Sequence, residues 1–340
     1  MHILIIGTGN LGLLYGWMFS QSGHRVTHLT RNLRPDLQET PVVFQLMDRR
    51  KERFKTGITA YMPDMVTSWK DAPAPDWIIA PIRHDHLLKL IPDLEKHFPG
   101  AKVALMGNFW MKALSLSPSL RQRTLIGFPH HGGQLAGGKW RGALTRSFSI
   151  WDDPVNPKPI TREFSDLLAE CGLNPHSSPV LDQWMAIHLA YNAGMMAALL
   201  SAGNLPELRT RPGLGYMWDV IKEGMQVMEK QGINTLLTSE GRTTRGSKEW
   251  FMFKMHILMG LPFVQPAIQY YLERGRQEAL AICHTLKCIA LEAGFETRLL
   301  DQVLPWEEGD EKQGKFSQIC APHKKGADES IDQEPIHAGS

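Results

Sequence analysis

The chain opens with HILIIGTGNLG, residues 2–12, and this stretch decides the fold. Its first five residues form an apolar run that is typical of a buried parallel strand. Gly7-Thr8-Gly9-Asn10-Leu11-Gly12 follows and matches the pattern GxGxxG, after which residues 11–22 have the pattern of a helix. A glycine motif that joins a strand to a helix in this way indicates a site for a dinucleotide. The opening therefore predicts a βαβ unit of the Rossmann type.

Each glycine of the motif has its own physical purpose. Gly7 permits the tight turn after the strand, Gly9 lets the backbone approach a pyrophosphate, and Gly12 lets the helix pack close to the strand. The first turn of the helix offers free N–H groups and a positive dipole to the phosphates. We therefore expect the whole motif to bind the cofactor, through Gly7, Thr8, Gly9, Asn10, Leu11 and Gly12.

The end of the second predicted strand, residues 25–29, distinguishes two cofactors. Proteins that bind NAD usually place Asp or Glu about 20 residues beyond the glycine motif, where it accepts a hydrogen bond from the ribose. This chain instead has Thr30-Arg31-Asn32, with Arg34 nearby. A guanidinium suits a 2′-phosphate, so we expect NADP(H) with Arg31 as its ligand. The alternative is that Arg31 is a solvated surface residue.

The remaining pattern predicts an α/β N-terminal Rossmann domain followed by an all-α C-terminal domain. Strands are expected at 42–46, 57–61, 77–82, 102–106, 124–127 and 148–151, a helix at 86–97, and a glycine-rich loop at 132–138. After residue 178 the periodicity is helical, with helices expected at 181–202, 215–231, 248–259 and 267–293. We place the domains at 1–178 and 179–304, the second for substrate and dimerisation, and expect a disordered polar tail at 305–340.

Composition excludes several classes of protein. The 340 residues include 37 basic and 35 acidic side chains, so the net charge of +2 gives no reason to expect nucleic acid or an anionic membrane as partner. The four cysteines fit no zinc pattern and no CxxC pair, which is typical of reduced thiols, and no metal is expected. The first strand begins at His2, leaving no room for a signal peptide, so we expect a cytoplasmic protein.

Three polar residues of the helical region are candidates for chemistry. His188 and Asn192 are four residues apart on the apolar segment 181–202, so they share one helix face. These polar residues also favour a central buried helix over a membrane span. Glu278 lies on a later helix. The alternatives are a core histidine that makes one hydrogen bond, and a solvated glutamate.

Together these residues resemble the ketopantoate reductase family (2-dehydropantoate 2-reductases and relatives) over about residues 1–300. The glycine motif with Arg31 carries the likeness first, followed by Ala80-Pro81-Ile82-Arg83 and Gly107-Asn108. The segment His188-Leu189-Ala190-Tyr191-Asn192 is similar to the family's Lys-Leu-Ala-x-Asn. Glu278 with Gly294 matches a late Glu-to-Gly spacing, and residues 127–138 are similar to a glycine-rich loop of many members.

The resemblance implies roles for further residues. Arg83, Asn108 and Gly133 would join the cofactor site, and Asn192 and Asn108 would hold the substrate. His188 stands where the family has the Lys that protonates the ketone oxygen, and Glu278 would assist catalysis.

The chain also departs from the family at three places. His188 replaces the general-acid Lys, Met196 replaces a second Asn, and the Ser that grips the substrate carboxylate has no evident counterpart near Gln265-Pro266. These departures favour a substrate other than ketopantoate.

The expected reaction is hydride transfer from NADPH to the carbonyl of a small 2-oxo acid or related ketone, in a cleft between the domains. One alternative is a dehydrogenase that oxidises a larger hydroxy compound, and another is a non-catalytic NADPH sensor. A homodimer through the helical domain is also expected.

Overall fold

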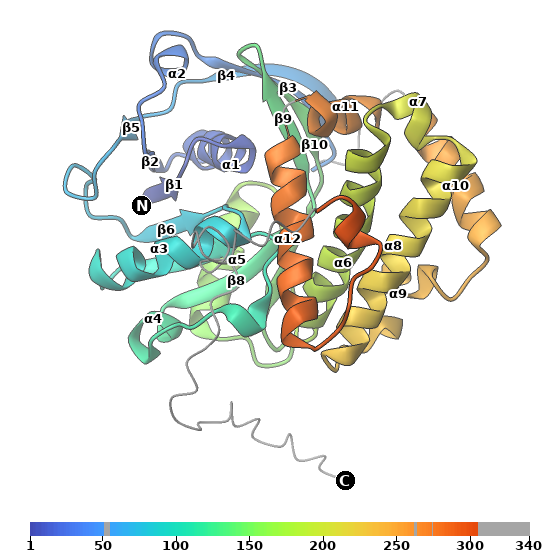
Figure 1. Ribbon diagram of the computed structural model, residues 1–340. Coiled ribbons are helices and arrows are strands. Elements are labelled where there is room, and N and C mark those ends of the chain that lie inside the picture. The colour runs from blue at the N-terminus through green and yellow to red at the C-terminus, as the bar shows by residue number, and fades with distance from the viewer. Residues whose placement is uncertain (51–54, 262–263, 274, 305–340) are drawn as a thin grey trace.

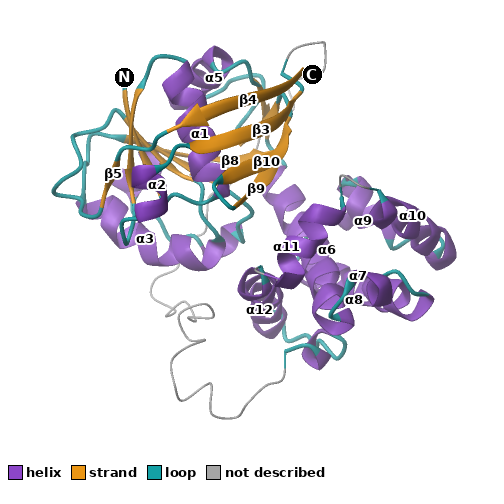
Figure 2. Cartoon of the chain, turned by 90° about the horizontal axis from the view of Figure 1, so that it is seen from above, coloured by secondary structure: helices purple, strands orange, loops and turns teal. Residues whose placement is uncertain are grey.

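The structure is a computed structural model that describes residues 1–50, 55–261, 264–273 and 275–304. Strands and helices mix up to Ser178, and the described residues that follow form helices. Figure 2 shows the two parts side by side, with every strand in the first. The expected fold class, a Rossmann-type domain followed by an all-helical domain, is therefore confirmed. The predicted tail, 305–340, lies outside the described residues.

The main sheet has eight strands in the order β12-β11-β8-β7-β6-β1-β2-β5. Neighbouring strands are parallel except β8 and β11, which are antiparallel. Because β1 lies between β2 and β6, the direction in which strands are added reverses at β1, and ligands of such sheets bind beyond the strand ends at that point. The strands are β1 (His2–Ile6), β2 (Arg25–Leu29), β5 (Met65–Val66), β6 (Trp77–Ala80), β7 (Lys102–Met106), β8 (Thr124–Pro129), β11 (Ser147–Trp151) and β12 (Asn174–Ser178).

A second sheet of four strands has the order β4-β3-β10-β9. It contains β3 (Val42–Asp48), β4 (Lys55–Tyr61), β9 (Gly132–Ala136) and β10 (Lys139–Leu144). The expectation of a glycine-rich loop at 132–138 is wrong, because residues 132–136 form β9. Gly137 and Gly138, with φ of +56° and +72°, make the two-residue turn into β10. Two consecutive positive φ angles are the geometry of a type I′ hairpin, which glycine favours.

Helices cover both faces of the main sheet (Figure 1). On one face α1 (Asn10–Gln21) and α5 (Pro159–Glu170) share a core with the second sheet, in which Phe44, Trp77 and Phe164 are buried. On the other face lie α3 (His84–Lys96) and α4 (Pro118–Gln122). The remaining short elements of this domain are α2 (Pro35–Glu39) and a 3₁₀ turn at Met111–Ala113.

The helical part has its own core. It consists of α6 (Leu181–Ala202), α7 (Leu205–Leu208), α8 (Arg211–Lys230), α9 (Ser239–Thr243), α10 (Lys248–Gly260), α11 (Gln265–Glu273) and α12 (Arg276–Glu292), with 3₁₀ turns at Thr235–Leu237 and Leu300–Gln302. The single helix expected at 267–293 is wrong, because the chain breaks there into α11 and α12. Gly275 is the N-cap residue of α12, and glycine disfavours the interior of a helix.

Helix α6 belongs to two cores. Leu181 and Met185 pack under the main sheet, whereas Ala190, Ala193 and Ala197 lie in the core of the helical part. Within the described ranges, α6 is the one helix long and apolar enough to cross a membrane, and 61% of its most apolar window is buried. Its composition is therefore that of a helix enclosed by protein on several sides.

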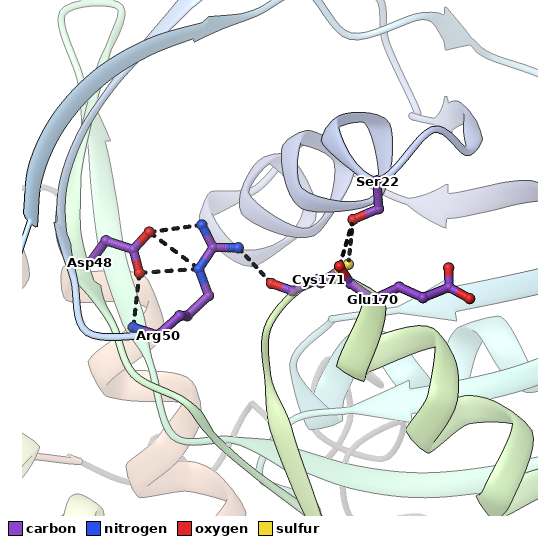
Figure 3. Close-up of polar contacts among 5 residues, drawn as sticks. All are labelled: Ser22, Asp48, Arg50, Glu170 and Cys171. Carbon is purple, nitrogen blue, oxygen red and sulfur yellow. Dashed lines mark hydrogen bonds and ion pairs between the residues drawn. The ribbon is translucent and has the colours of Figure 1, made fainter. Parts of the chain in front are cut away.

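Polar contacts connect the end of α1 and the end of β3 to the end of α5 (Figure 3). The Arg50 guanidinium pairs with Asp48 at 2.8 Å and donates to the carbonyl of Cys171 at 2.6 Å. Ser22, at the end of α1, donates to the carbonyl of Glu170 at 3.3 Å. These contacts tie β3 and α1 to the end of α5.

The expectation of reduced thiols holds for part of the chain. Cys171 and Cys283 are free and buried. It is wrong for Cys288, which is disulfide-bonded.

A buried histidine forms a hydrogen bond with the first residue of the glycine motif. His28 is fully buried on β2, its Nδ1 lies 3.0 Å from the carbonyl oxygen of Gly7, and its Nε2 lies 2.9 Å from the Tyr61 hydroxyl. Since a carbonyl only accepts, Nδ1 carries the proton and the Tyr61 hydroxyl donates to Nε2. Burial lowers the pKa of His28 to about 4.

We predict that acid destabilises the protein through its buried histidines. His28, His84 and His131 each have a pKa lowered to about 4 by burial, against about 6.5 in an unfolded chain. Between these values the unfolded chain binds more protons, so stability is present above pH 6.5 and is lost as the pH falls toward 4. Each histidine contributes up to about 3 kcal/mol to this loss.

Urea unfolding between pH 7 and 4 measures the effect. The variant His28→Gln should flatten the dependence of the unfolding free energy on pH, while His256→Gln, at an exposed ring, should leave it unchanged. An equal slope in wild type and His28→Gln would contradict the assignment.

Candidate functional site

The glycine motif has the geometry that its sequence requires. Gly7 has a φ of +93°, and its N–H donates to the carbonyl of Leu29 at 2.7 Å. A Cβ on Gly12 would lie 2.6 Å from the carbonyl oxygen of Gly7, so the helix approaches the turn as closely as glycine allows. A Cβ on Gly9 would meet nothing within 4 Å, which leaves open space beside the backbone. Gly9 caps α1 without a side-chain hydrogen bond, so the first N–H groups of the helix remain available to a ligand.

Positive charge borders this loop at the end of β2. Arg31 is exposed and makes no hydrogen bond or ion pair to the described residues. The neighbouring Arg34 pairs with Asp36 at 2.6 Å and donates to the carbonyl of Thr8 at 3.5 Å. Burial lowers the pKa of His86, and the charge of Arg31 adds to that shift, so Arg31 also faces the start of α3.

Arg83 lies near charged and polar groups of the helical part. It follows β6 and forms a two-pronged hydrogen bond with Asp85, at 3.0 and 2.8 Å. Burial raises the pKa of Tyr270 on α11, the nearby Glu278 adds to the rise and the nearby Asn10 opposes it. Burial raises the pKa of Glu278 and the charge of Arg83 opposes the rise. Asn10, Arg83, Tyr270 and Glu278 therefore form one polar group, the glycine-loop group, to which four separate segments contribute.

Asn108 and Gly133 have structural partners. Oriented by its neighbours, the Asn108 amide donates to the carbonyl of Met185 at 2.8 Å and accepts from the N–H of Leu189 at 3.2 Å. Asn108 thus fixes α6 to the end of β7 one residue from His188. Gly133 pairs with Gly142 in the second sheet, where a side chain would collide with Trp140. The Asn10 side chain accepts from the N–H of the nearby Leu135 at 2.9 Å, so β9 lies against the glycine motif.

His188 packs against two aromatic side chains, Trp184 and Phe128, which we call the aromatic wall. Its ring stacks on Trp184 at 4.6 Å between centroids and meets Phe128 edge-on at 5.3 Å. A quarter of the side chain is exposed, and Nδ1 is buried without a hydrogen bond, 3.9 Å from the Glu240 carboxylate. Burial lowers the pKa of His188 to about 4, Glu240 opposes the shift and His130 adds to it.

Asn192 lies one turn beyond His188 and is half-buried. Its amide makes no hydrogen bond to the described residues, so its donors and acceptor are available. Met196, one further turn along, is 5% exposed and offers no polar group. The structure thus brings Asn108, His188 and Asn192 together as a second set, the α6 group.

Several residues of this arrangement had escaped the sequence analysis. Asp85 and His86 lie in the first turn of α3, shortly after Arg83, a signal that could have been used. Tyr270, Glu240 and His130 meet the site only through the fold, and no local pattern marks them.

A cavity of about 600 Å³ opens elsewhere, between α8 and α10. None of the predicted site residues lines it. Its walls are Arg211, Pro212, Gly215, Tyr216, Asp219, Lys248, Glu249 and Met252. Among the described residues, no group of three His, Cys, Asp or Glu side chains could hold a metal ion.

Known proteins share this architecture. Residues 3–148 match the family model described as ketopantoate reductase PanE/ApbA. The dimeric ketopantoate reductase from Staphylococcus aureus is similar over 94% of this chain and 98% of its own, with a TM-score of 0.63 and 17% identity. The 2-dehydropantoate 2-reductase from Geobacter metallireducens GS-15 is similar over 89% and 97%, with a TM-score of 0.63 and 16% identity.

A dehydrogenase shares the fold as well. D-mandelate dehydrogenase, solved with NADH and anilino(oxo)acetate, is similar over 94% of this chain and 97% of its own, with a TM-score of 0.62 and 17% identity. No curated protein sequence matches the chain. At this identity the structural likenesses establish the fold, and the family model matches the N-terminal part only. Residues 3–148 therefore resemble the ketopantoate reductase family, and the chain shares the fold of its solved members.

Proposed function

We propose that the protein is an oxidoreductase that uses NADPH to reduce the carbonyl of a small 2-oxo acid or a related ketone. The observation that carries the proposal is the glycine motif at the point where the strand order reverses. There the open space at Gly9, the uncapped N-terminus of α1 and the charge of Arg31 fit a pyrophosphate and a 2′-phosphate. When bound, the cofactor supplies the hydride.

The chain's own residues would bind and orient the cofactor and the substrate, and would protonate the carbonyl oxygen. Arg83 and Glu278 would position cofactor and substrate beside the glycine motif, and Asn192 would hold the substrate hydroxyl or carboxylate with its unpaired amide. Asn108 acts by holding α6, which sets His188 relative to the end of β7. His188 would then deliver a proton to the carbonyl oxygen as negative charge develops there.

The aromatic wall favours a substrate larger or less polar than ketopantoate. Phe128 and Trp184 enclose His188 with apolar rings. The D-mandelate dehydrogenase that shares this fold was solved with anilino(oxo)acetate, which carries an aromatic ring beside its oxoacetate group. The same wall supports a second candidate function, oxidation of a hydroxy compound, because a pKa of about 4 leaves His188 neutral and able to accept a proton at pH 7.

We also infer a homodimer through the helical part. Trp250, Phe253 and Ile257 lie exposed at helical spacing on α10, and the first two rings stack at 5.4 Å. An exposed apolar stripe of this kind is typical of an interface. The similar ketopantoate reductase from Staphylococcus aureus is described as dimeric. A cytoplasmic location stays a prediction from the sequence.

Turnover with a panel of carbonyl acids tests the function. Aromatic 2-oxo acids should be reduced with loss of NADPH absorbance, and ketopantoate weakly or not at all. Efficient reduction of ketopantoate, with kcat/KM of about 10⁴ M⁻¹s⁻¹ or more, would contradict the substrate proposal. NADPH binding without turnover of any carbonyl or hydroxy compound would instead favour a sensor.

Cofactor choice should depend on Arg31. We expect NADPH to bind at least about tenfold more tightly than NADH, since one charge-assisted pair with a phosphate is worth more than about 1.4 kcal/mol. Arg31→Ala should remove most of this preference and leave NADH affinity unchanged in a fluorescence titration. Gly9→Val is the matched variant: it should lose both cofactors while keeping the melting temperature, because its side chain enters open space. Equal affinity of the wild type for both cofactors would contradict the assignment.

His188→Ala should lower kcat by about 10²–10⁴-fold, the usual contribution of a general acid or base, and leave NADPH affinity nearly unchanged. The limb of the pH profile that reports its titration should also disappear. Measuring kcat and melting temperature on the same variant separates catalysis from packing. A less stable variant with unchanged kcat per folded molecule would assign the ring to the core alone.

A further inference from the structure

Glu240 is the carboxylate that faces His188. It lies on α9, a short helix that packs against α6 beside Ile187. Its Oε2 accepts from the Ser239 hydroxyl at 3.1 Å, and its Oε1 points to Nδ1 of His188 at 3.9 Å. Both side chains of the pair are about a quarter exposed. The carboxylate is therefore held by its neighbour with one oxygen directed at the ring.

The two nitrogens of the His188 ring have different surroundings. Nδ1 is buried and without a hydrogen bond, and Glu240 is the acceptor in front of it. Nε2 makes no hydrogen bond to the described residues and is not among the buried unpaired atoms, so it is the more exposed nitrogen of the ring. A proton on Nδ1 would face the carboxylate, which is how second partners set the tautomer and orientation of catalytic histidines.

We propose that Glu240 is a positioning residue for His188: it orients the ring through Nδ1 and stabilises the imidazolium, so that Nε2 delivers the proton to the substrate oxygen. The inference rests on the proposed function, because it assigns a role within the same site.

The other groups around the ring do not favour its charged form. Trp184 and Phe128 are neutral and exclude water, and His130, beyond the end of β8, adds a positive charge when protonated. Tyr191, on the next part of α6, also faces Glu240 and stays neutral, since burial raises its pKa. Glu240 is thus the negative charge that opposes burial at His188.

The hydride, the proton and the two electrons of the reaction come from the reduced cofactor and His188. A bound reduced nicotinamide would supply the hydride for the new C–H bond at the carbonyl carbon, and the carbonyl π electrons would move to oxygen. The Nε2–H bond of His188 breaks as the new O–H bond forms. Cofactor oxidation and ketone reduction account for both electrons, and solvent returns the proton to His188. Oxidation of a hydroxy compound is the reverse, with Nε2 accepting the proton.

The pKa of His188 in the folded protein tests the pairing without any turnover. Proton NMR titration of the histidine rings reports it, and the signal lost in His188→Gln identifies the residue. Glu240→Gln should lower the pKa of His188 by about one unit or more, because an opposite charge at 4–6 Å shifts a pKa by that amount. Glu240→Asp keeps the charge and should restore most of the shift. Glu249→Gln removes an exposed carboxylate of α10 and should change nothing.

Kinetics provide the second measurement. In the reductive direction the kcat limb that falls as the pH rises should move about one unit lower in Glu240→Gln, so kcat at pH 7 should fall about tenfold. Affinity for NADPH should not change. A role in packing alone would lower the melting temperature and leave the pH limb in place.

The outcomes separate this inference from the proposed function. If the wild type turns over a carbonyl acid while Glu240→Gln changes neither the pKa of His188 nor the pH limb, the inference is overturned and the function stands. If no carbonyl or hydroxy compound is turned over, the proposed function is overturned and the positioning role falls with it, whatever the NMR shift shows about the charge pair.

Discussion

The rest of the structure depends on one close approach, that of Gly12 to the carbonyl of Gly7. A side chain at Gly12 would stand 2.6 Å from that oxygen, so only glycine lets α1 start directly against the end of β1. This contact aims the N-terminus of α1 at the point where the strand order reverses. The His28 ring contacts the same Gly7 carbonyl through Nδ1. The Asn10 side chain accepts a hydrogen bond from Leu135 of β9 and lies near Tyr270. The second sheet and the helical part are therefore arranged around this turn.

The pattern of apolar residues and glycines in the sequence predicted those elements whose formation depends mainly on neighbouring residues. The strand, turn and helix at residues 2–21 follow from a short apolar run and glycine, and the bounds of α6 match its apolar run because burial on several sides needs that composition. β9 was missed because two glycines at its start suggested a loop, although the requirement there is close packing on Trp140. The break between α11 and α12 was missed because apolar residues at helical spacing lie on both sides of it, although residues 273–278 carry no apolar side chain.

The candidate site could be predicted only where its residues lie on one element. His188 and Asn192 share a helix face, and Arg31 follows a strand, so spacing was enough to select them. Their partners come from elsewhere: Glu240 reaches His188 across 52 residues of sequence, and Tyr270 reaches Asn10 across 260. Asn108 was selected, but its contact with the backbone of α6 could not be foreseen, because it depends on how β7 meets a helix that begins 75 residues after β7 ends.

Since α6 gives its first turn to the core under the main sheet and the remainder to the helical core, neither half of the chain has a complete interior alone. A fragment that stops at the last strand would leave the surface normally covered by Leu181 and Met185 open to water, and a fragment that begins with α6 would expose those two side chains instead. The protein should therefore unfold as a single cooperative unit despite its two-part appearance. During synthesis, the surface of the sheet that Leu181 and Met185 cover would stay exposed until α6 has left the ribosome.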